Sequence, residues 1–136
     1  MHDPRLVGAR VATLATIDPD GRTHLVPIVF AIDGDTLYSA VDRKPKRSQT
    51  LRRMENARAR PDVTVLVDHY EEDWRRLWWI RLRGRARVLE EGEERERALE
   101  LLAGKYAQYR ADPPDGAVLA VDVTEVREWA AASGGR

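Results

Sequence analysis

The 136-residue sequence predicts a mainly β (α+β) fold, a small six-stranded antiparallel barrel with helices packed outside it. Apolar, β-branched runs alternate with turn signals such as Asp18-Pro19-Asp20-Gly21 and Asp33-Gly34-Asp35. Strand–helix alternation is absent from residues 1–40, which disfavours a doubly wound parallel sheet. The length suits one hydrophobic core, so residues 1–136 are expected to form a single domain.

The first part of the chain is expected to form a short helix and an antiparallel meander. The helix is placed at residues 4–9, and the strands at 11–17, 23–32 and 36–41. Pro27 interrupts the second of these strands and cannot donate a hydrogen bond to a neighbour. That strand is therefore expected at a sheet edge or at a bulge.

The rest of the chain is expected to supply two helices and three strands. The helices are placed at residues 48–57 and 90–109, and the strands at 62–70, 77–89 and 117–129. In the first helix, Leu51, Met54 and Ala57 form one narrow apolar stripe that faces a sheet. Asn56 and the Arg60-Pro61 pair mark the end of this helix.

The strand at 77–89 carries a row of cations. Alternation places Trp78, Ile80, Leu82, Gly84, Ala86 and Val88 on one face, and Trp79, Arg81, Arg83, Arg85 and Arg87 on the other. Guanidinium groups in a row do not belong in the core of a monomer. This face is therefore expected to meet water, a partner subunit or an anionic ligand.

Composition excludes several classes of protein. The chain has no cysteine and three widely separated histidines, so disulfides and thiolate chemistry are excluded and no metal site is expected. It shows neither an apolar run that could span a bilayer nor the apolar core of a signal peptide, which indicates a cytoplasmic protein with no membrane partner. The formal net charge of zero argues against a general nucleic-acid-binding protein.

One segment departs from this neutrality. Between Arg43 and Arg60 there are eight Arg or Lys and one Glu, a local net charge of +7. Cations gathered just ahead of a helix start suit an anion such as phosphate, because their charge adds to the free N–H groups and positive dipole end of the helix. The alternative is that these side chains only solvate a surface helix face, and composition alone leaves the two readings even.

Three stretches together resemble a known family. The first runs from Tyr38-Ser39-Ala40-Val41-Asp42 through Arg43-Lys44-Pro45-Lys46-Arg47, the second is Leu51-Arg52-Arg53, and the third is Pro61-Asp62-Val63-Thr64-Val65-Leu66-Val67-Asp68. They are similar to the pyridoxamine 5′-phosphate oxidase-like flavin and deazaflavin proteins, whose fold is the FMN-binding split β-barrel. The continuation from Asp68-His69-Tyr70-Glu71-Glu72-Asp73-Trp74 to Leu77-Trp78-Trp79-Ile80-Arg81 resembles the actinobacterial branch that uses coenzyme F420.

The resemblance implies a homodimer with two cofactor sites at the subunit interface. The cofactor phosphate would fall on Arg43, Lys44, Lys46 and Arg47, with Lys46 and Arg47 competing for one position. The strand Val26, Pro27, Ile28 would present its backbone to the edge of the ring, with Ser39 on the strand before the turn, and Trp78, Trp79 and Arg81 would approach from the partner subunit. The plainer readings are an edge-strand breaker for Pro27 and simple burial for the tryptophans.

In such a protein the cofactor performs the hydride chemistry and the chain binds and orients it, so no side chain is assigned a catalytic role. The first hypothesis is an oxidoreductase that uses F420 for hydride transfer to a small unsaturated or quinone-like substrate. The alternative is an FMN-binding oxidase or flavin reductase, since the cationic turn suits FMN phosphate equally well. A third reading, binding of nucleic acid through the segments 43–60 and 81–87, is weakened by the balancing acidic residues.

Overall fold

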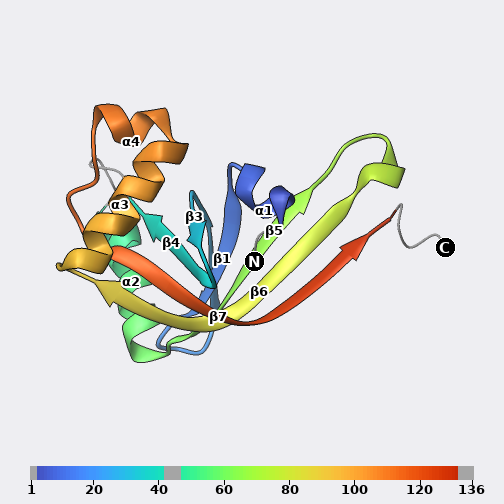
Figure 1. The fold of residues 1–136 in the computed structure, drawn as a ribbon. Coiled ribbons are helices and arrows are strands. Elements are labelled where there is room, and N and C mark those ends of the chain that lie inside the picture. The colour runs from blue at the N-terminus through green and yellow to red at the C-terminus, as the bar shows by residue number, and fades with distance from the viewer. Residues whose placement is uncertain (1–2, 42–46, 132–136) are drawn as a thin grey trace.

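The computed structural model describes residues 3–41 and 47–131, and for residues 47–51 the backbone alone. The elements in chain order are α1 (Pro4–Gly8), β1 (Ala12–Ile17), β2 (Thr23–Ile28), β3 (Ala31–Asp33), β4 (Thr36–Ala40), α2 (Arg47–Ala59), β5 (Asp62–His69), the short 3₁₀ turn η1 (Trp74–Arg76), β6 (Trp78–Leu89), α3 (Glu93–Lys105), α4 (Ala107–Ala111) and β7 (Val118–Ala130) (Figure 1). The mainly β fold with peripheral helices is therefore confirmed.

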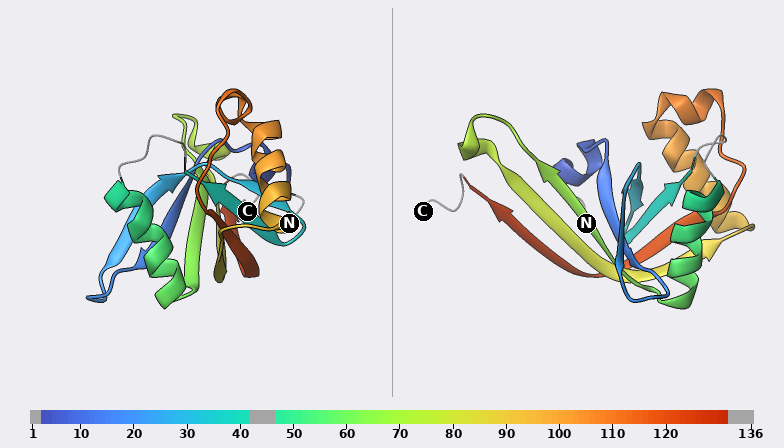
Figure 2. Two further views of the ribbon diagram at one scale, coloured as in Figure 1. Left: turned by 90° about the vertical axis from the view of Figure 1, so that its left-hand side faces the viewer. Right: turned by 180° about the vertical axis from the view of Figure 1, so that it is seen from behind.

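The described strands form one antiparallel sheet in the order β2-β1-β5-β6-β7-β4-β3. Its two edge strands, β2 and β3, are joined by Val29 and Phe30 alone, so the sheet curls until its edges approach each other. Figures 1 and 2 show the resulting half-barrel, with α2 on one side and α3 on another. The split barrel is confirmed, with seven strands rather than six.

Both predicted hairpins of the first part of the chain are confirmed, but the predicted strand at 23–32 is broken in two, and this interrupts the meander. The N–H of Phe30 donates to the Tyr106 hydroxyl at 3.1 Å, and that hydroxyl lies 3.1 Å from the carbonyl oxygen of Phe30. Both backbone groups of Phe30 thus lie within hydrogen-bond distance of a side chain instead of a neighbouring strand. The strand breaks there, and β2 pairs with β1 while β3 pairs with β4.

The single helix predicted at 90–109 is divided at the same place. Tyr106 has extended backbone dihedrals (φ −120°, ψ 117°) and separates α3 from α4. Its hydroxyl also reaches the carbonyl oxygen of Arg10 at 3.0 Å, which fixes the side chain at the seam between β1 and β3. The first long helix, α2, ends at Ala59, directly before the Arg60-Pro61 pair, so that predicted stop is confirmed. The helix passes Asn56 and extends two residues beyond the predicted end at 57.

The core fills the inside of the curl. Its largest fully buried side chains include Leu14, Phe30, Leu37, Ile80 and Leu82. A second cluster, beneath α3 and α4, includes Ala98, Leu102, Tyr106, Tyr109 and Val118. In the predicted stripe of α2, Met54 and Ala57 are buried as expected, and the side chain of Leu51 lies outside the described atoms. Within residues 3–41 and 47–131, no helix is long and apolar enough to cross a membrane.

The two longest strands, β6 and β7, continue past the barrel. Together with the end of β5 and the turn η1 they form an extension, called the arm here (residues 66–81 and 126–131), which Figure 1 shows at the right. A β-bulge between Arg83 and Gly84 lies where the arm leaves the barrel. A Cβ atom at Gly84 would overlap the carbonyl oxygen of Asp122, so this crossing of β6 and β7 requires glycine.

Candidate functional site

The predicted site residues near the barrel gather where β2 and β4 end. Along β2, Val26 is half-buried, Pro27 is exposed and Ile28 is buried. The Ser39 hydroxyl is buried and donates to the carbonyl oxygen of Val29 at 2.7 Å, which ties the end of β4 to the end of β2. Pro27 lies on an edge strand, as predicted.

The predicted phosphate ligands follow the end of β4 in the sequence. Arg47 is the first residue of α2, and its side chain is not among the described atoms. Arg43, Lys44 and Lys46 lie outside the described residues. Their role in phosphate binding therefore stays a prediction, as does the choice between Lys46 and Arg47.

The position of α2 is fixed by a polar cluster that sequence reasoning missed. The buried amide of Asn56 donates to Thr16 Oγ1 at 3.1 Å and to Asp18 Oδ1 at 2.9 Å. Arg52 donates to the same Asp18 oxygen at 3.2 Å. The bonds from Asn56 and then Arg52 lower the pKa of Asp18. The helix that follows the cationic residues in the sequence is thus held against the β1–β2 hairpin.

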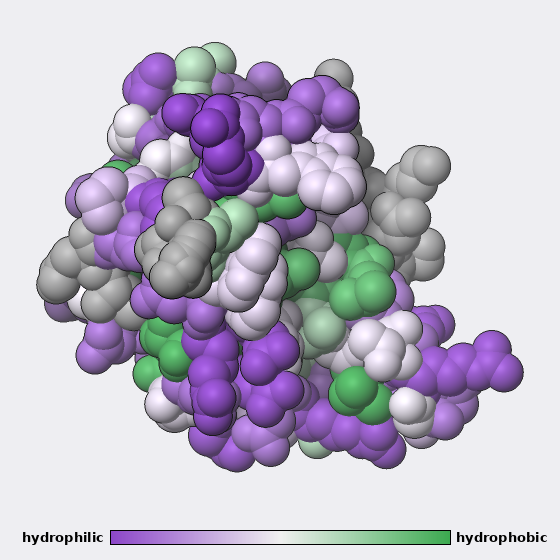
Figure 3. Space-filling view, turned by 90° about the vertical axis from the view of Figure 1, so that its right-hand side faces the viewer, coloured by the Kyte–Doolittle hydropathy of each residue, from purple (hydrophilic) through white to green (hydrophobic). Residues whose placement is uncertain are grey.

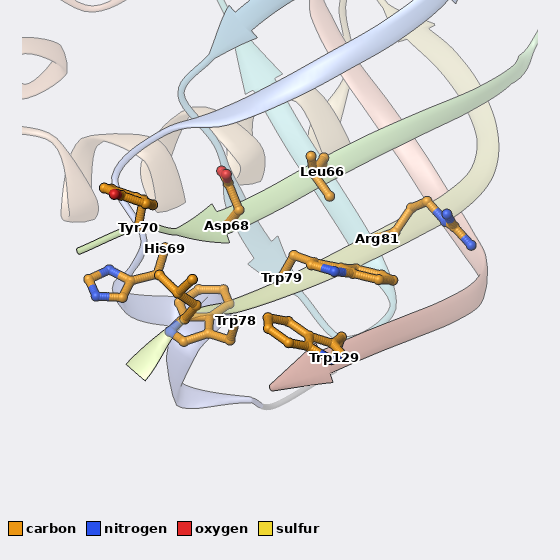
Figure 4. Close-up of a pocket in the computed structure, with 9 residues that line it drawn as sticks. Leu66, Asp68, His69, Tyr70, Trp78, Trp79, Arg81 and Trp129 are labelled. Carbon is orange, nitrogen blue, oxygen red and sulfur yellow. The ribbon is translucent and has the colours of Figure 1, made fainter. Parts of the chain in front are cut away.

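The other predicted residues lie on the arm, where they line a pocket of about 340 Å³ (Figure 4). Its lining residues are Leu66, Asp68, His69, Tyr70, Leu77, Trp78, Trp79, Arg81 and Trp129. Strand register explains which side chains form the floor of the pocket, because Trp79 pairs with Asp68 on β5 and with Trp129 on β7. Figure 3, which views the molecule from the arm side, shows apolar patches bordered by hydrophilic side chains.

Arg81 stands at one side of this pocket. Its buried Nε atom has no hydrogen-bond partner in the described part of the protein, and its guanidinium carbon lies 5.5 Å from the centroid of the Trp79 ring. Attraction to an aromatic face costs the guanidinium none of its hydrogen-bonding groups. An anion that enters the pocket could therefore accept hydrogen bonds from the Arg81 guanidinium.

Trp78 faces the opposite side of β6 from Trp79, as strand alternation predicts. Its ring stacks with that of His69 at a centroid distance of 6.0 Å and lies 5.2 Å from the guanidinium of Arg5. Arg5 is in turn paired with Glu128 at 2.6 Å. Trp78 thus closes one end of the pocket and also fastens α1 to the arm.

The opposite end of β6 carries a network of charges. Arg87 donates to both carboxylate oxygens of Glu94 at 2.8 Å and to Asp122 at 2.7 and 2.9 Å. The Tyr38 hydroxyl donates to Glu94 at 2.7 Å. Arg87, followed by Tyr38, lowers the pKa of Glu94 to about 2, and burial followed by Glu94 raises the pKa of Tyr38 to about 12. This network fastens α3 to the sheet.

The structure therefore brings together the ends of β2 and β4, with Val26, Pro27, Ile28 and Ser39, but it places Trp78, Trp79 and Arg81 elsewhere, on the arm. Figures 1 and 2 show α2 at one end of β6 and the arm at the other. The predicted site did not include the other residues that line this pocket, Leu66, Asp68, His69, Tyr70, Leu77 and Trp129. Pairing the strands at 77–89 and 117–129 as neighbours would have placed Trp129 beside Trp79.

Solved structures with the same fold are numerous. A conserved hypothetical protein, Rv2991 of Mycobacterium tuberculosis, superposes with a TM-score of 0.75 at 21% identity over 95% of this chain and 82% of its own. An FAD-binding protein of Mesorhizobium loti gives 0.65 at 23% identity over 90% and 85%. A heme-binding protein of Mycobacterium smegmatis gives 0.73 at 21% identity over 97% of this chain and 53% of its own.

These identities establish a shared fold. No curated protein sequence matches the chain. The family of pyridoxamine 5′-phosphate oxidase matches residues 2–130, nearly the whole sequence. That match agrees with the curled antiparallel sheet, its two approaching edges and the helices outside it. The chain belongs to the pyridoxamine 5′-phosphate oxidase family.

Proposed function

We propose that the protein is a homodimeric oxidoreductase that uses coenzyme F420 for hydride transfer to a small unsaturated or quinone-like substrate. The observation that carries the proposal is the division of the predicted site between the two ends of β6. One end has the strand termini that lead into the cationic segment. The other has an aromatic pocket with a buried guanidinium atom that has no hydrogen-bond partner among the residues that the structure describes. Each end of β6 therefore offers part of a binding site for a phosphorylated ring cofactor: cations for the phosphate at one end and aromatic faces for the ring at the other.

A two-fold dimer would join these parts. An isologous interface places the arm of each chain against the α2 end of its partner and generates two identical sites. In each site Arg43, Lys44, Lys46 and Arg47 would hold the phosphate of the cofactor. The backbone of 26–28 would face the ring edge, held in place by the bond from Ser39 to Val29.

The partner's arm would supply the surface for the flat ring. Trp79 and Trp129 provide aromatic faces, and Trp78 and His69 close one end. Arg81 fits an anionic cofactor because its Nε donor is buried without a partner among the described residues. A deazaflavin carries a hydride at its C5 carbon, so the chain's task is to bind, orient and shield the reactants. We place this activity in the cytoplasm, within one domain that spans residues 1–136.

The alternative, an FMN-binding oxidase or flavin reductase, rests on the family match and on the fold shared with an FAD-binding protein. The F420 assignment rests on the resemblance of residues 68–81. Fluorescence titration of the purified protein with F420 and FMN separates the two. Tighter binding of F420, and oxidation of reduced F420 on addition of a quinone, support the proposal. Tighter binding of FMN overturns the F420 assignment.

A mixed-dimer experiment tests the site shared between two chains. One variant carries Arg43→Gln, Lys44→Gln, Lys46→Gln and Arg47→Gln, and the other carries Arg81→Met. Each alone is expected to bind poorly, because both of its sites lack one half. After co-refolding, a heterodimer has one site with both halves intact, so about a quarter of all sites should recover binding. No recovery in heterodimers isolated by two different affinity tags would contradict a site built from both subunits.

A further inference from the structure

Lys105 has unusual surroundings for a lysine. It is the last residue of α3, it is half-buried, and it lies beside Arg10, which precedes β1, and Phe30, which precedes β3. Its Nζ atom lies 3.9 Å from the centroid of the Phe30 ring and 5.4 Å from that of Tyr106. In the described part of the chain, the contacts of this ammonium are thus aromatic rather than acidic.

A second cation stands beside it. The guanidinium of Arg10 lies 4.7 Å from the centroid of the same Tyr106 ring and donates to the carbonyl oxygen of Lys105 at 3.0 Å. Burial, and next the charge on Arg10, lower the pKa of Lys105 to about 8. The groups that face the ammonium are therefore two rings and a like charge, none of which holds a proton on it as a carboxylate would.

This geometry has a chemical consequence. The uncharged amine is the nucleophilic form of lysine, and a pKa near 8 leaves roughly a tenth of the molecules in that form at neutral pH. The side chain of Arg10 is exposed, and its bond to Lys105 uses one of five N–H donors. The remaining donors suit the oxygens of a phosphate group.

We propose that Lys105 is a site of non-enzymatic acylation by acyl phosphates, with Arg10 binding the phosphate of the donor. The amine attacks the acyl carbon, a C–N bond forms, and the bond from that carbon to the phosphate oxygen breaks. Inorganic phosphate leaves with the bonding electrons, and the amine proton passes to water. The product is a neutral amide over Phe30, which removes the charge repulsion with Arg10.

The sequence makes the reaction easy to follow, because the chain has three lysines, Lys44, Lys46 and Lys105. The whole protein is incubated with acetyl phosphate at neutral pH, together with a free lysine derivative as reference, and modification is located by peptide mass mapping. We expect Lys105 to react about tenfold faster than the reference, because its larger amine fraction outweighs its lower basicity. We also expect its rate to level off just above pH 8. A rate at Lys105 no faster than the reference, or one still rising steeply above about pH 10, would overturn the proposal.

Two variants separate the role of Arg10 from that of the lysine itself. Lys105→Arg keeps the charge and should abolish acetylation at this position. Arg10→Gln should lower the rate with acetyl phosphate about fivefold more than the rate with a neutral acetyl ester, since only the former loses a charge contact. Arg10→Lys should restore part of that preference. Equal effects of Arg10→Gln on both reagents would overturn the acyl phosphate assignment. None of these substitutions touches the proposed cofactor site.

Discussion

Arg81 and Arg87 lie on the same face of one strand, yet their surroundings are opposite. Arg87 is saturated by Glu94 and Asp122, whereas the Nε of Arg81 is buried without a hydrogen-bond partner in the described structure. The neighbours make the difference, because Arg87 faces the first turn of α3 and Arg81 faces the arm pocket. A row of identical cations in a sequence can therefore contain both a structural ion pair and a side chain whose buried donor has no partner among the described residues.

The largest effect is expected from Gly84, which separates the two halves of the strand. Gly84→Ala places a methyl group against the carbonyl oxygen of Asp122, so β6 and β7 must move apart. We expect a loss of about 3 kcal/mol in the free energy of unfolding, measured by urea denaturation. Gly104→Ala is the control, because its Cβ meets no atom within 4 Å inside α3 and should stabilise by about 0.5–1 kcal/mol. A Gly84→Ala protein as stable as wild type would show that the bulge adapts freely.

Arg87→Met tests the structural role of Arg87. This change leaves the carboxylates of Glu94 and Asp122 without the cation that both of them pair with. We expect a loss of about 2 kcal/mol in unfolding free energy, held to that size because the Arg87 side chain is 42% exposed. Arg85→Met, which removes a pair to the exposed Asp62, should cost less than about 0.5 kcal/mol. Equal losses for the two variants would mean that the network adds nothing beyond a surface pair.

The role proposed for Arg81 is tested by Arg81→Met, which keeps an unbranched apolar stem and removes the guanidinium together with its cation–π contact to Trp79. Because no hydrogen bond of its buried Nε atom is lost, stability should stay within about 0.5 kcal/mol of wild type. Affinity for the cofactor should fall about tenfold, as measured by fluorescence titration. A large loss of stability with unchanged affinity would reverse the roles assigned to the two arginines.

The smallest expected effect is that of low pH on the stability that the network of Arg87, Glu94 and Asp122 supplies. The pKa of Glu94 is about 2 in the folded protein, below its ordinary value of 4.5. The stabilisation is therefore complete above the ordinary pKa and is lost as pH falls from about 4.5 towards 2. Wild type should lose about 1 kcal/mol more than Arg87→Met between about pH 5 and pH 2.5, a modest value because these carboxylates are partly exposed. Parallel pH profiles for the two proteins would exclude this source of stability.

Local patterns predicted most of the fold. The strand at 77–89 reads as apolar residues alternating with arginine, and its burial alternates in the same way. What local patterns could not show depends on contacts distant in sequence. Phe30 and Tyr106 are separated by 76 positions, and their bonds divide both a predicted strand and a predicted helix. Asn56 looked like a helix terminator, yet it is a buried donor to Thr16 and Asp18.

The candidate site was less accessible to sequence reasoning. Alternation placed Trp79 and Arg81 on one face, and the structure agrees. It could not distinguish Arg81 from Arg87, because that distinction depends on Glu94 and Asp122 from other elements. Nor could it place the two halves of the site at opposite ends of β6, since that arrangement follows from the order of strands in the sheet.

The approaching sheet edges bear on how the protein avoids self-association into fibrils. An open edge strand offers unpaired N–H and C=O groups to any passing strand. Here β2 contains Pro27, which lacks the N–H that an added strand would bond, and β3 has only three residues. Neither of these two edges is a good template for another chain, so the gap between them is protected by their own sequences instead of by closure of the barrel.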